Sequence, residues 1–328
     1  MAMTPDTWQN GRRRRPAGRM YGGFFLKGMA MGCADLVPGV SGGTIALILG
    51  IYEQLIHSIR RLGRAAFWHP LMSLKPGQAL LAVDAPFLAT VFAGMLFAIV
   101  AFARALSWLA VHHPVMLASF FFGLVAASVL VVAGRVRRWR SFLVVGFLAS
   151  AVSAYGLAGL APAQTPETVW FVAVSGAIAV CALILPGISG AFILLLLGKY
   201  QFMLDAVSRV DLAVIAVFGV GAVIGLVSFA QLLGWLLKRF HDVMLIVLAG
   251  LMLGSLRKLW PWKEADELAP EELTANTLPS LFEAGRLNPE VPLGLLFALL
   301  GLAAVLGMNA FESGRLQAAR KDDASGNE

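Results

Sequence analysis

The sequence predicts an all-α integral membrane protein with about six full transmembrane helices and two re-entrant helical hairpins of opposite orientation. Three observations predict this fold class. Of the 328 residues, 59% are hydrophobic and only 14% are charged, whereas soluble globular domains carry about 25% charged residues. Several long apolar stretches are present, and one short motif occurs twice. No soluble core could absorb this much apolar surface, so we expect the chain to lie in a bilayer.

The repeated motif reads PGVSGGTIALILGIY from Pro38 to Tyr52 and PGISGAFILLLLGKY from Pro186 to Tyr200. In each copy, Pro-Gly and Ser-Gly pairs interrupt an apolar stretch, because proline disrupts a helix and glycine permits sharp turns. The apolar segments around the first copy are too short to cross a bilayer comfortably, which favours a re-entrant hairpin. Around the second copy no charge occurs from Thr168 to Gly198, so two full crossings stay open as an alternative there.

Six other stretches are long and apolar enough to be crossing helices. They are residues 86–109, 114–134, 141–161, 212–237, 241–259 and 291–311. The chain is thereby divided into a basic N-terminal tail, one membrane domain and a polar C-terminal tail. The predicted bounds are 1–20 for the first tail, 21–311 for the membrane domain and 312–328 for the second tail, with half one at about 21–140, half two at about 165–311 and the helix 141–161 linking them.

The distribution of positive charge predicts the topology. With the N-terminus in the cytoplasm, the inner segments hold nineteen Lys and Arg residues and the outer loops hold five. Because cytoplasmic loops carry an excess of these residues, we expect both termini inside and residues 260–290 to form an acidic extracytoplasmic loop. Three crossings separate the two hairpins, and an odd number inverts the side of entry. The first hairpin should enter from the cytoplasm and the second from outside.

A second internal similarity supports duplication of whole halves. The segment FFGLVAAS (Phe121–Ser128) is similar to LAGLMLGS (Leu248–Ser255), and each belongs to the third element of its half. Inverted repeats with paired broken helices are typical of secondary transporters, whose binding sites lie near the bilayer midplane where the breaks meet. A duplicated membrane scaffold without a transport role is the alternative.

The residues of the two breaks predict a site for an anionic group such as phosphate. A helix N-terminus carries a partial positive charge and binds anions, and Ser and Thr add hydroxyl donors. The phosphate-binding candidates are Gly39, Ser41, Gly42, Gly43, Thr44, Gly187, Ser189 and Gly190, with Lys199 and Arg104 as cations on the outer side. The alternatives are that the hydroxyls only cap their own helices and that the two cations extend to the membrane interface.

Asp35 precedes the first break, and its aligned partner in the second copy is Leu183. A carboxylate within a membrane is by default a functional hypothesis. It could carry a coupling proton, or it could accept hydrogen bonds from the backbone of the Gly39–Gly43 turn, and the sequence leaves both roles open. Glu53 is a second proton-coupling candidate, with solvation at the cytoplasmic interface as its alternative role.

Other chemistries have little support. The motif GVSGGT lacks the lysine of a P-loop, and GVSGG resembles a nucleophile elbow only without its strand and histidine partner. Cys33 and Cys181 occupy equivalent positions without metal-ligand spacing, and packing as small residues explains them more simply than a functional pair. We therefore expect no catalytic residue, no metal, no cofactor and no nucleic-acid partner, while the oligomeric state is left open.

At these motifs the sequence resembles a known family. The segments ADLVPGVSGGTIALILGIYEQLI and LPGISGAFILLLLGKY are similar to the paired signatures of the bacterial polyprenyl-phosphate transporters of the PopT type, over roughly residues 20–311. The resemblance implies a carrier in the bacterial plasma membrane that returns undecaprenyl phosphate from the outer to the inner leaflet for envelope glycan synthesis, with proton coupling as one mechanism. In the second motif, Ala191 and Phe192 stand where small polar residues are expected.

Two further functions stay open at this point. One is a carrier or channel for a small soluble anion, and the other is a membrane enzyme that acts on a lipid phosphate. A protein groove that shelters a phosphate head while the tail stays in lipid favours the lipid carrier, because burying a bare charge in hydrocarbon is very costly.

Overall fold

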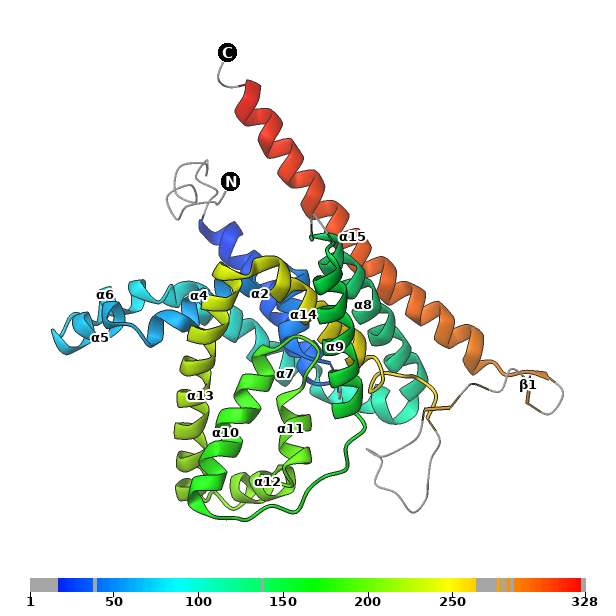
Figure 1. Ribbon diagram of the computed structural model, residues 1–328, viewed down its shortest axis with the longest axis horizontal. Helices are drawn as coiled ribbons and strands as arrows, with labels where there is room; N and C mark the ends of the chain where they lie inside the picture. The colour runs from blue at the N-terminus through cyan, green and yellow to red at the C-terminus, as the bar shows by residue number, and fades with distance from the viewer. Residues whose placement is uncertain are drawn as a thin grey trace.

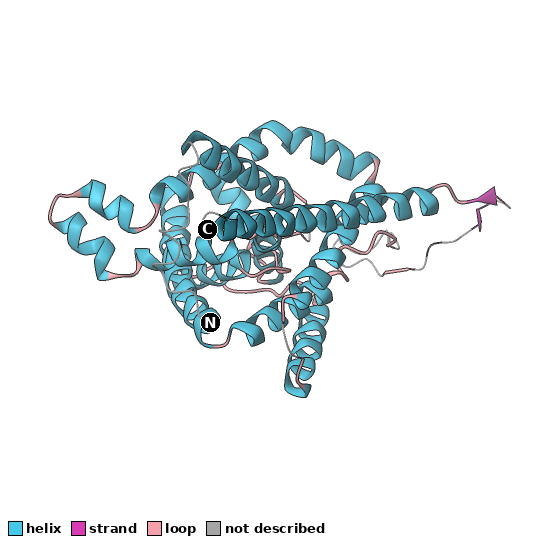
Figure 2. Ribbon diagram, turned by 90° about the horizontal axis from the view of Figure 1, so that it is seen from above, coloured by secondary structure: helices cyan, strands magenta, loops and turns pink. Residues whose placement is uncertain are grey.

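The computed structural model describes residues 17–37, 40–136, 139–263, 276–277, 279, 282–283 and 286–325, and these are almost entirely helical (Figures 1 and 2). The helices of the first part are α2 (Ala17–Asp35), α3 (Gly42–Ile48), α4 (Tyr52–Leu62), α5 (Ala65–Met72), α6 (Pro76–Ala82), α7 (Ala85–His112), α8 (Pro114–Gly134) and α9 (Ser141–Leu157). The second part contains α10 (Val169–Ile184), α11 (Gly190–Leu196), α12 (Tyr200–Ser208), α13 (Leu212–Arg239), α14 (His241–Ser255) and α15 (Glu290–Ser325). Two short antiparallel strands, β1 (Phe282–Glu283) and β2 (Arg286–Leu287), precede α15.

A helix occupies each of the six stretches that the sequence predicted to cross the membrane. Four of these helices are long and apolar enough to span a bilayer, namely α7, α8, α13 and the part of α15 from Glu290 to Ala310. The other two, α9 and α14, are shorter, with 17 and 15 residues. The last helix continues to Ser325, so residues 312–325 of the predicted C-terminal tail belong to α15. The chain is a multi-pass membrane protein.

Both copies of the repeated motif form the same sequence of elements: a long helix, a break, a seven-residue helix, a glycine turn and another helix. The turn contains Gly50 in the first copy and Gly198 in the second, with φ of 66° and 62°, a conformation that glycine adopts without steric cost. A seven-residue helix is about 10 Å long, too short to complete a crossing of about 30 Å. The chain also bends by 107° between α11 and α12. The second copy therefore contains a bent helix pair, as a re-entrant hairpin or a broken span would.

The long helices pack in the same way in both parts of the chain. In the first part α2 lies along α7, and in the second part α10 lies along α13. The two remaining pairs are exchanged, because α15 packs along α8 and α9 packs along α14. The helix α9, which the sequence suggested as a linker, thus takes the place beside α14 that α15 takes beside α8. Each half contributes one helix to the other, which joins the two halves into one body.

Glycines at equivalent positions permit the close approach within the α2–α7 and α10–α13 pairs. A Cβ atom at Gly28 of α2 would lie 2.1 Å from the carbonyl oxygen of Val91 in α7. A Cβ atom at Gly176 of α10 would lie 2.4 Å from the carbonyl oxygen of Phe218 in α13. The two glycines are 148 positions apart and their partners are 127 positions apart. These are the offsets that relate α3 to α11 and α7 to α13, so the correspondence extends to single residues.

The exchanged pairs use the glycines of the second sequence similarity. A Cβ atom at Gly123 would lie 1.9 Å from the carbonyl oxygen of Ala298 in α15. A Cβ atom at Gly250 would lie 2.5 Å from the carbonyl oxygen of Phe147 in α9. Small residues let membrane helices approach closely, and such packing replaces the hydrophobic effect that lipid removes. This shared use of FFGLVAAS and LAGLMLGS supports the duplication that the sequence indicated.

These contacts predict that adding one methyl group separates the helices. Gly250→Ala should destabilise the folded protein by about 1–3 kcal/mol, because the new Cβ atom would overlap the backbone of α9. Gly146→Ala on α9 is the matched control, since a Cβ atom at Gly146 would have no other atom within 4 Å and alanine favours the helix. Thermal unfolding of the purified variants in detergent measures both effects. Equal melting temperatures for the two variants would contradict the packing role of Gly250.

Candidate functional site

The two breaks lie in contact at the centre of the protein. The backbone N–H of Gly187 donates a hydrogen bond to Oγ1 of Thr44 over 3.0 Å. In the opposite sense, the hydroxyl of Ser41 donates to the carbonyl oxygen of Leu183 over 3.3 Å. A Cβ atom at Gly43 would also lie 2.7 Å from the carbonyl oxygen of Ile184. The start of α3 is therefore seated on the break that follows α10, and the candidates from both motifs come together.

At the first break, nearby side chains already accept hydrogen bonds from the backbone N–H groups at the start of α3. Oδ1 of Asp35, the last residue of α2, accepts a hydrogen bond from the backbone N–H of Gly42 over 2.6 Å. The hydroxyl of Ser41 caps α3 by accepting from the N–H of Gly43 over 3.2 Å. Ser41 and Thr44 are each only 1% exposed. In this conformation Asp35 fills the structural role that the sequence left open, and its carboxylate occupies the place that an anion would take at α3. Gly39 lies outside the described residues.

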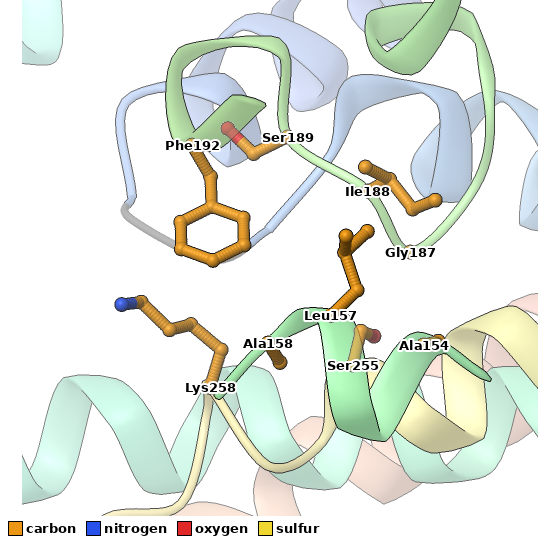
Figure 3. Close-up of a pocket in the computed structure, with 9 residues that line it drawn as sticks. All are labelled: Ala154, Leu157, Ala158, Gly187, Ile188, Ser189, Phe192, Ser255 and Lys258. Carbon is orange, nitrogen blue, oxygen red and sulfur yellow. The ribbon is translucent and has the colours of Figure 1, made fainter. Parts of the chain in front are cut away.

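The second break opens into a small cavity instead. Figure 3 shows the cavity between the start of α11, the end of α9 and the end of α14. Its lining residues are Ala154, Leu157, Ala158, Gly187, Ile188, Ser189, Phe192, Ser255 and Lys258. Ser189 is the N-cap residue of α11, yet its side chain does not cap the helix. Within the described part of the chain its hydroxyl has no hydrogen-bond partner, so it is available to a ligand.

Lys258 brings positive charge to this cavity, and the sequence analysis counted it only as a loop cation. Its Nζ atom lies 4.7 Å from the centroid of the Phe192 ring, and Figure 3 shows the amine beside that ring. The neighbouring Arg257 donates from Nη1 to the carbonyl oxygen of Tyr155 over 3.0 Å. One feature of the sequence could have drawn attention to these cations. They follow LAGLMLGS, in the third element of the second half, within three residues.

A third cation, Lys263, contacts the backbone of Lys258. Nζ of Lys263 donates to the carbonyl oxygen of Lys258 over 2.9 Å. The pKa of Lys263 lies below its ordinary value, first because the amine is partly desolvated and second because Lys258 carries the same charge nearby. The two amines therefore lie in one region of positive charge after α14.

The other candidates from the sequence lie away from the breaks. Lys199 is only 2% exposed, and its amine donates to the carbonyl oxygen of Thr165 over 2.9 Å without lining the cavity. Arg104 is exposed on α7. Glu53 is also exposed, with Oε1 3.8 Å from Nδ1 of His241. Neither Arg104 nor Glu53 lines the cavity at the second break.

The described residues contain no group of three metal-ligating side chains. The two cysteines are both free. The thiol of Cys181 on α10 lies 3.5 Å from the carbonyl oxygen of Gly225 on α13, a contact between two packed helices. Its position agrees with the packing role that the sequence favoured for the cysteines.

Comparisons with known proteins place the chain in a family. A family model described as VCA0040-like, undecaprenyl phosphate translocase-like, matches residues 31–276. The chain is 43% identical over 304 residues to a Vibrio cholerae serotype O1 protein named polyprenyl-phosphate transporter, covering 89% of this chain and 97% of that protein. It is 28% identical over 261 residues to a Staphylococcus aureus protein of the same name, covering 72% of this chain and 85% of that protein. No solved structure matches the chain. The chain therefore belongs to the VCA0040-like family of undecaprenyl phosphate translocase-like proteins.

Proposed function

We propose that this protein carries polyprenyl phosphate, in the form of undecaprenyl phosphate, from the outer to the inner leaflet of the bacterial plasma membrane. It acts as a carrier and not as an enzyme, and the returned lipid is reused in envelope glycan synthesis. The named transporters to which the chain is similar support the substrate. The observation that carries the proposal is the cavity at the second break, which Ser189 and Lys258 both line.

The cavity supplies the interactions that a phosphate head requires. The hydroxyl of Ser189 donates one hydrogen bond, and the amine of Lys258 adds a charge-assisted contact. The first-turn N–H groups of α11 have no partner inside their own helix and add partial positive charge. A phosphate that left water would exchange its hydration shell for these donors, while its polyprenyl tail stayed in hydrocarbon. The large cost of burying the bare charge is lowered in this way.

The cavity as it stands is smaller than a phosphate head. It leaves about 20 Å³ for the centre of a water-sized sphere, which is room for about one water molecule. Phosphate binding therefore requires the ends of α9 and α14 to move away from α11. Such a movement is expected of a carrier that exposes its site to one side of the membrane at a time.

Asp35 would act at the first break when the lipid head moves inward. Its carboxylate already accepts the hydrogen bond from Gly42, so an ionised Asp35 and a phosphate would compete for the same backbone donors and repel one another. Protonation of Asp35 removes this repulsion. We propose on this basis that a proton accompanies the inward step, and that Leu183 leaves the second break open to phosphate at every stage.

The first test concerns the phosphate ligands. Ser189→Ala and Lys258→Gln should each weaken binding of a fluorescent polyprenyl phosphate in nanodiscs by about tenfold, because each removes one hydrogen bond to a charged group. Matched controls are Ser153→Ala, whose hydroxyl bonds within α9, and Lys75→Gln, which is exposed. Unchanged lipid affinity in both site variants would remove the cavity from the proposal. Stronger effects on inorganic phosphate than on the lipid would favour the soluble-anion carrier.

The second test separates the two roles of Asp35. Asp35→Asn keeps the size of the side chain and removes the titrating charge. If a proton moves with the lipid, flipping driven by a pH gradient in reconstituted vesicles should be lost while lipid binding persists or strengthens. If Asp35 only holds the turn, binding should weaken and the free energy of unfolding should fall by about 1–3 kcal/mol. Asp242→Asn, at an exposed position in the first turn of α14, is the control. Flipping that is unchanged across pH would eliminate proton transfer through Asp35.

The third test addresses orientation, because the direction of transport depends on it. In a variant without Cys33 and Cys181, a cysteine at exposed Ser73 should react with an impermeant maleimide only from the cytoplasmic side. A cysteine at exposed Gln164 should react only from outside. Labelling of intact cells and of inverted vesicles distinguishes the two sides. Reaction of both sites from the same side would refute the opposite orientation of the two hairpins.

A further inference from the structure

The helix α4 packs across α13, and this contact, here called a seam, is separate from the cavity at the second break. Nε of Arg60 donates to Oε1 of Gln231 over 2.9 Å, and Nε2 of Gln231 donates back to the carbonyl oxygen of Arg60 over 2.7 Å. Each residue thus both donates and accepts. A Cβ atom at Gly63 would lie 2.6 Å from Cγ1 of Val227, and one at Gly234 would lie 2.9 Å from Cδ of Arg60. The two helices are closely packed here.

The duplication identifies the residues that correspond to this seam in the other half. The offset of 148 positions that relates α3 to α11 takes Arg60 to Ser208, the last residue of α12. The offset of 127 positions that relates α7 to α13 takes Gln231 to Arg104. The glycine contacts of Gly28 with Val91 and of Gly176 with Phe218 obey both offsets. The same structural relation therefore pairs α12 with α7 and Ser208 with Arg104.

This second seam is open in the structure. Among the described helices, α12 packs on α11 and α13 and has no comparable contact with α7. The hydroxyl of Ser208 donates within its own helix, to the carbonyl oxygen of Asp205 over 2.9 Å. Arg104 is exposed, and within the described part of the chain its guanidinium has no hydrogen-bond or ion-pair partner. One half of the protein makes the contact that the other half lacks.

The two breaks differ in the same sense as the two seams. Every residue of α3 is buried. In the same half, α4 is bonded to α13 through Arg60 and Gln231. In α11 the equivalent helix leaves Ala191 exposed and Ser189 half-buried beside the cavity. Two separate observations thus describe the same asymmetry: the first hairpin has a buried α3 and an α4 packed on α13, while the second has an exposed Ala191 and an α12 that does not pack on α7.

We propose that the Arg60–Gln231 pair closes the cytoplasmic side of the carrier, and that Arg104 closes the outer side in the opposite state by pairing with Ser208 at the end of α12. This proposal rests on the function proposed above. In inverted-repeat carriers the two halves exchange conformations as the site turns from one side to the other. In the opposite state the Arg60–Gln231 seam opens, and α12 swings onto α7. Arg104 is then a gate residue, and not the phosphate ligand that the sequence suggested.

The chemistry of the second seam suits this contact. Arg104 supplies several N–H donors in a planar group, and the C-terminal end of α12 presents unpaired backbone carbonyl groups together with the hydroxyl of Ser208. Asp205 lies one turn earlier on α12 and is exposed, so its carboxylate is a second acceptor. In the first seam the arginine, Arg60, lies on the short helix α4. In the second seam the arginine, Arg104, lies on the long helix α7. Each seam therefore contains one cation.

Accessibility of the cavity tests the proposal without requiring transport. In a variant without Cys33 and Cys181, Ser189→Cys reports whether the outer side is open to an impermeant maleimide. Arg104→Ala should raise its rate of labelling, because the state that closes the outer side has lost its contact. Gln231→Ala should lower the rate, because the state seen here has lost its contact. Removal of one hydrogen-bonded pair shifts a two-state equilibrium roughly fivefold to tenfold. Changes in the same direction, or none, would overturn the assignment.

Cross-linking provides the second measurement. A cysteine pair replacing Arg60 and Gln231 should cross-link in the present state, and a pair replacing Arg104 and Ser208 should cross-link in the opposite state. Either cross-link should stop lipid flipping, and Gln231→Ala should increase the yield of the outer one. Cysteines replacing Arg104 and Gln201, which lies two turns earlier on α12, form the control pair. An outer pair that never exceeds this control shows that the second seam does not close.

The two measurements also distinguish this proposal from the function on which it rests. If the seams behave as stated but polyprenyl phosphate is neither bound nor moved, the gates belong to a carrier of another anion. If Arg104→Ala weakens polyprenyl-phosphate binding about tenfold and leaves Ser189→Cys labelling unchanged, Arg104 is a ligand, and the gate assignment is wrong while the lipid carrier stands.

Discussion

The structure depends on satisfying backbone N–H groups where two helices break inside the membrane. Hydrocarbon offers no hydrogen-bond partners, so each freed group must find one in the protein or face a polar cavity. The first break uses the carboxylate of Asp35 and the hydroxyl of Ser41. The second break donates from Gly187 to Thr44 and otherwise opens toward Ser189 and Lys258. The difference between these two solutions leaves a small cavity at the second break and pairs the donors at the first.

Close packing at glycines holds the helices around the two breaks in place. The α2–α7 and α10–α13 pairs are held by equivalent glycines, and the α8–α15 and α9–α14 pairs join the halves. Close packing of this kind resists continuous deformation, so movement is concentrated at the less extensive contacts. The seam between α4 and α13, with its reciprocal pair of polar residues, is such a contact. Closely packed helix pairs combined with one small polar contact suit a protein that must alternate between two states of similar free energy.

The placement of charge agrees with a carrier for an anionic head. Lys258 lines the cavity at the second break, and Lys263 contacts its backbone, with a pKa lowered first by desolvation and second by the charge of Lys258. The carboxylate of Asp35 is at the other end of the contact between the two breaks. A negatively charged head is attracted at the first of these places and repelled at the second while Asp35 is ionised. Protonation at Asp35 would therefore control the second part of the path and leave capture unaffected.

The sequence alone determined the membrane class, a helix in each of six apolar stretches, the breaks in both copies of the motif and the internal similarity, because hydropathy, proline and glycine act locally along the chain. It also predicted that the breaks containing Ser41, Thr44, Gly187 and Ser189 meet, and the structure brings the two breaks into contact. Only the tertiary structure decided which of them are already paired. Ser41 meets Leu183 across 142 positions of sequence, and Lys258 reaches the cavity only because α14 packs beside α9. The sequence could not distinguish a cation that lines a cavity, such as Lys258, from an exposed cation such as Arg104, because that distinction depends on which helix faces lie together after folding.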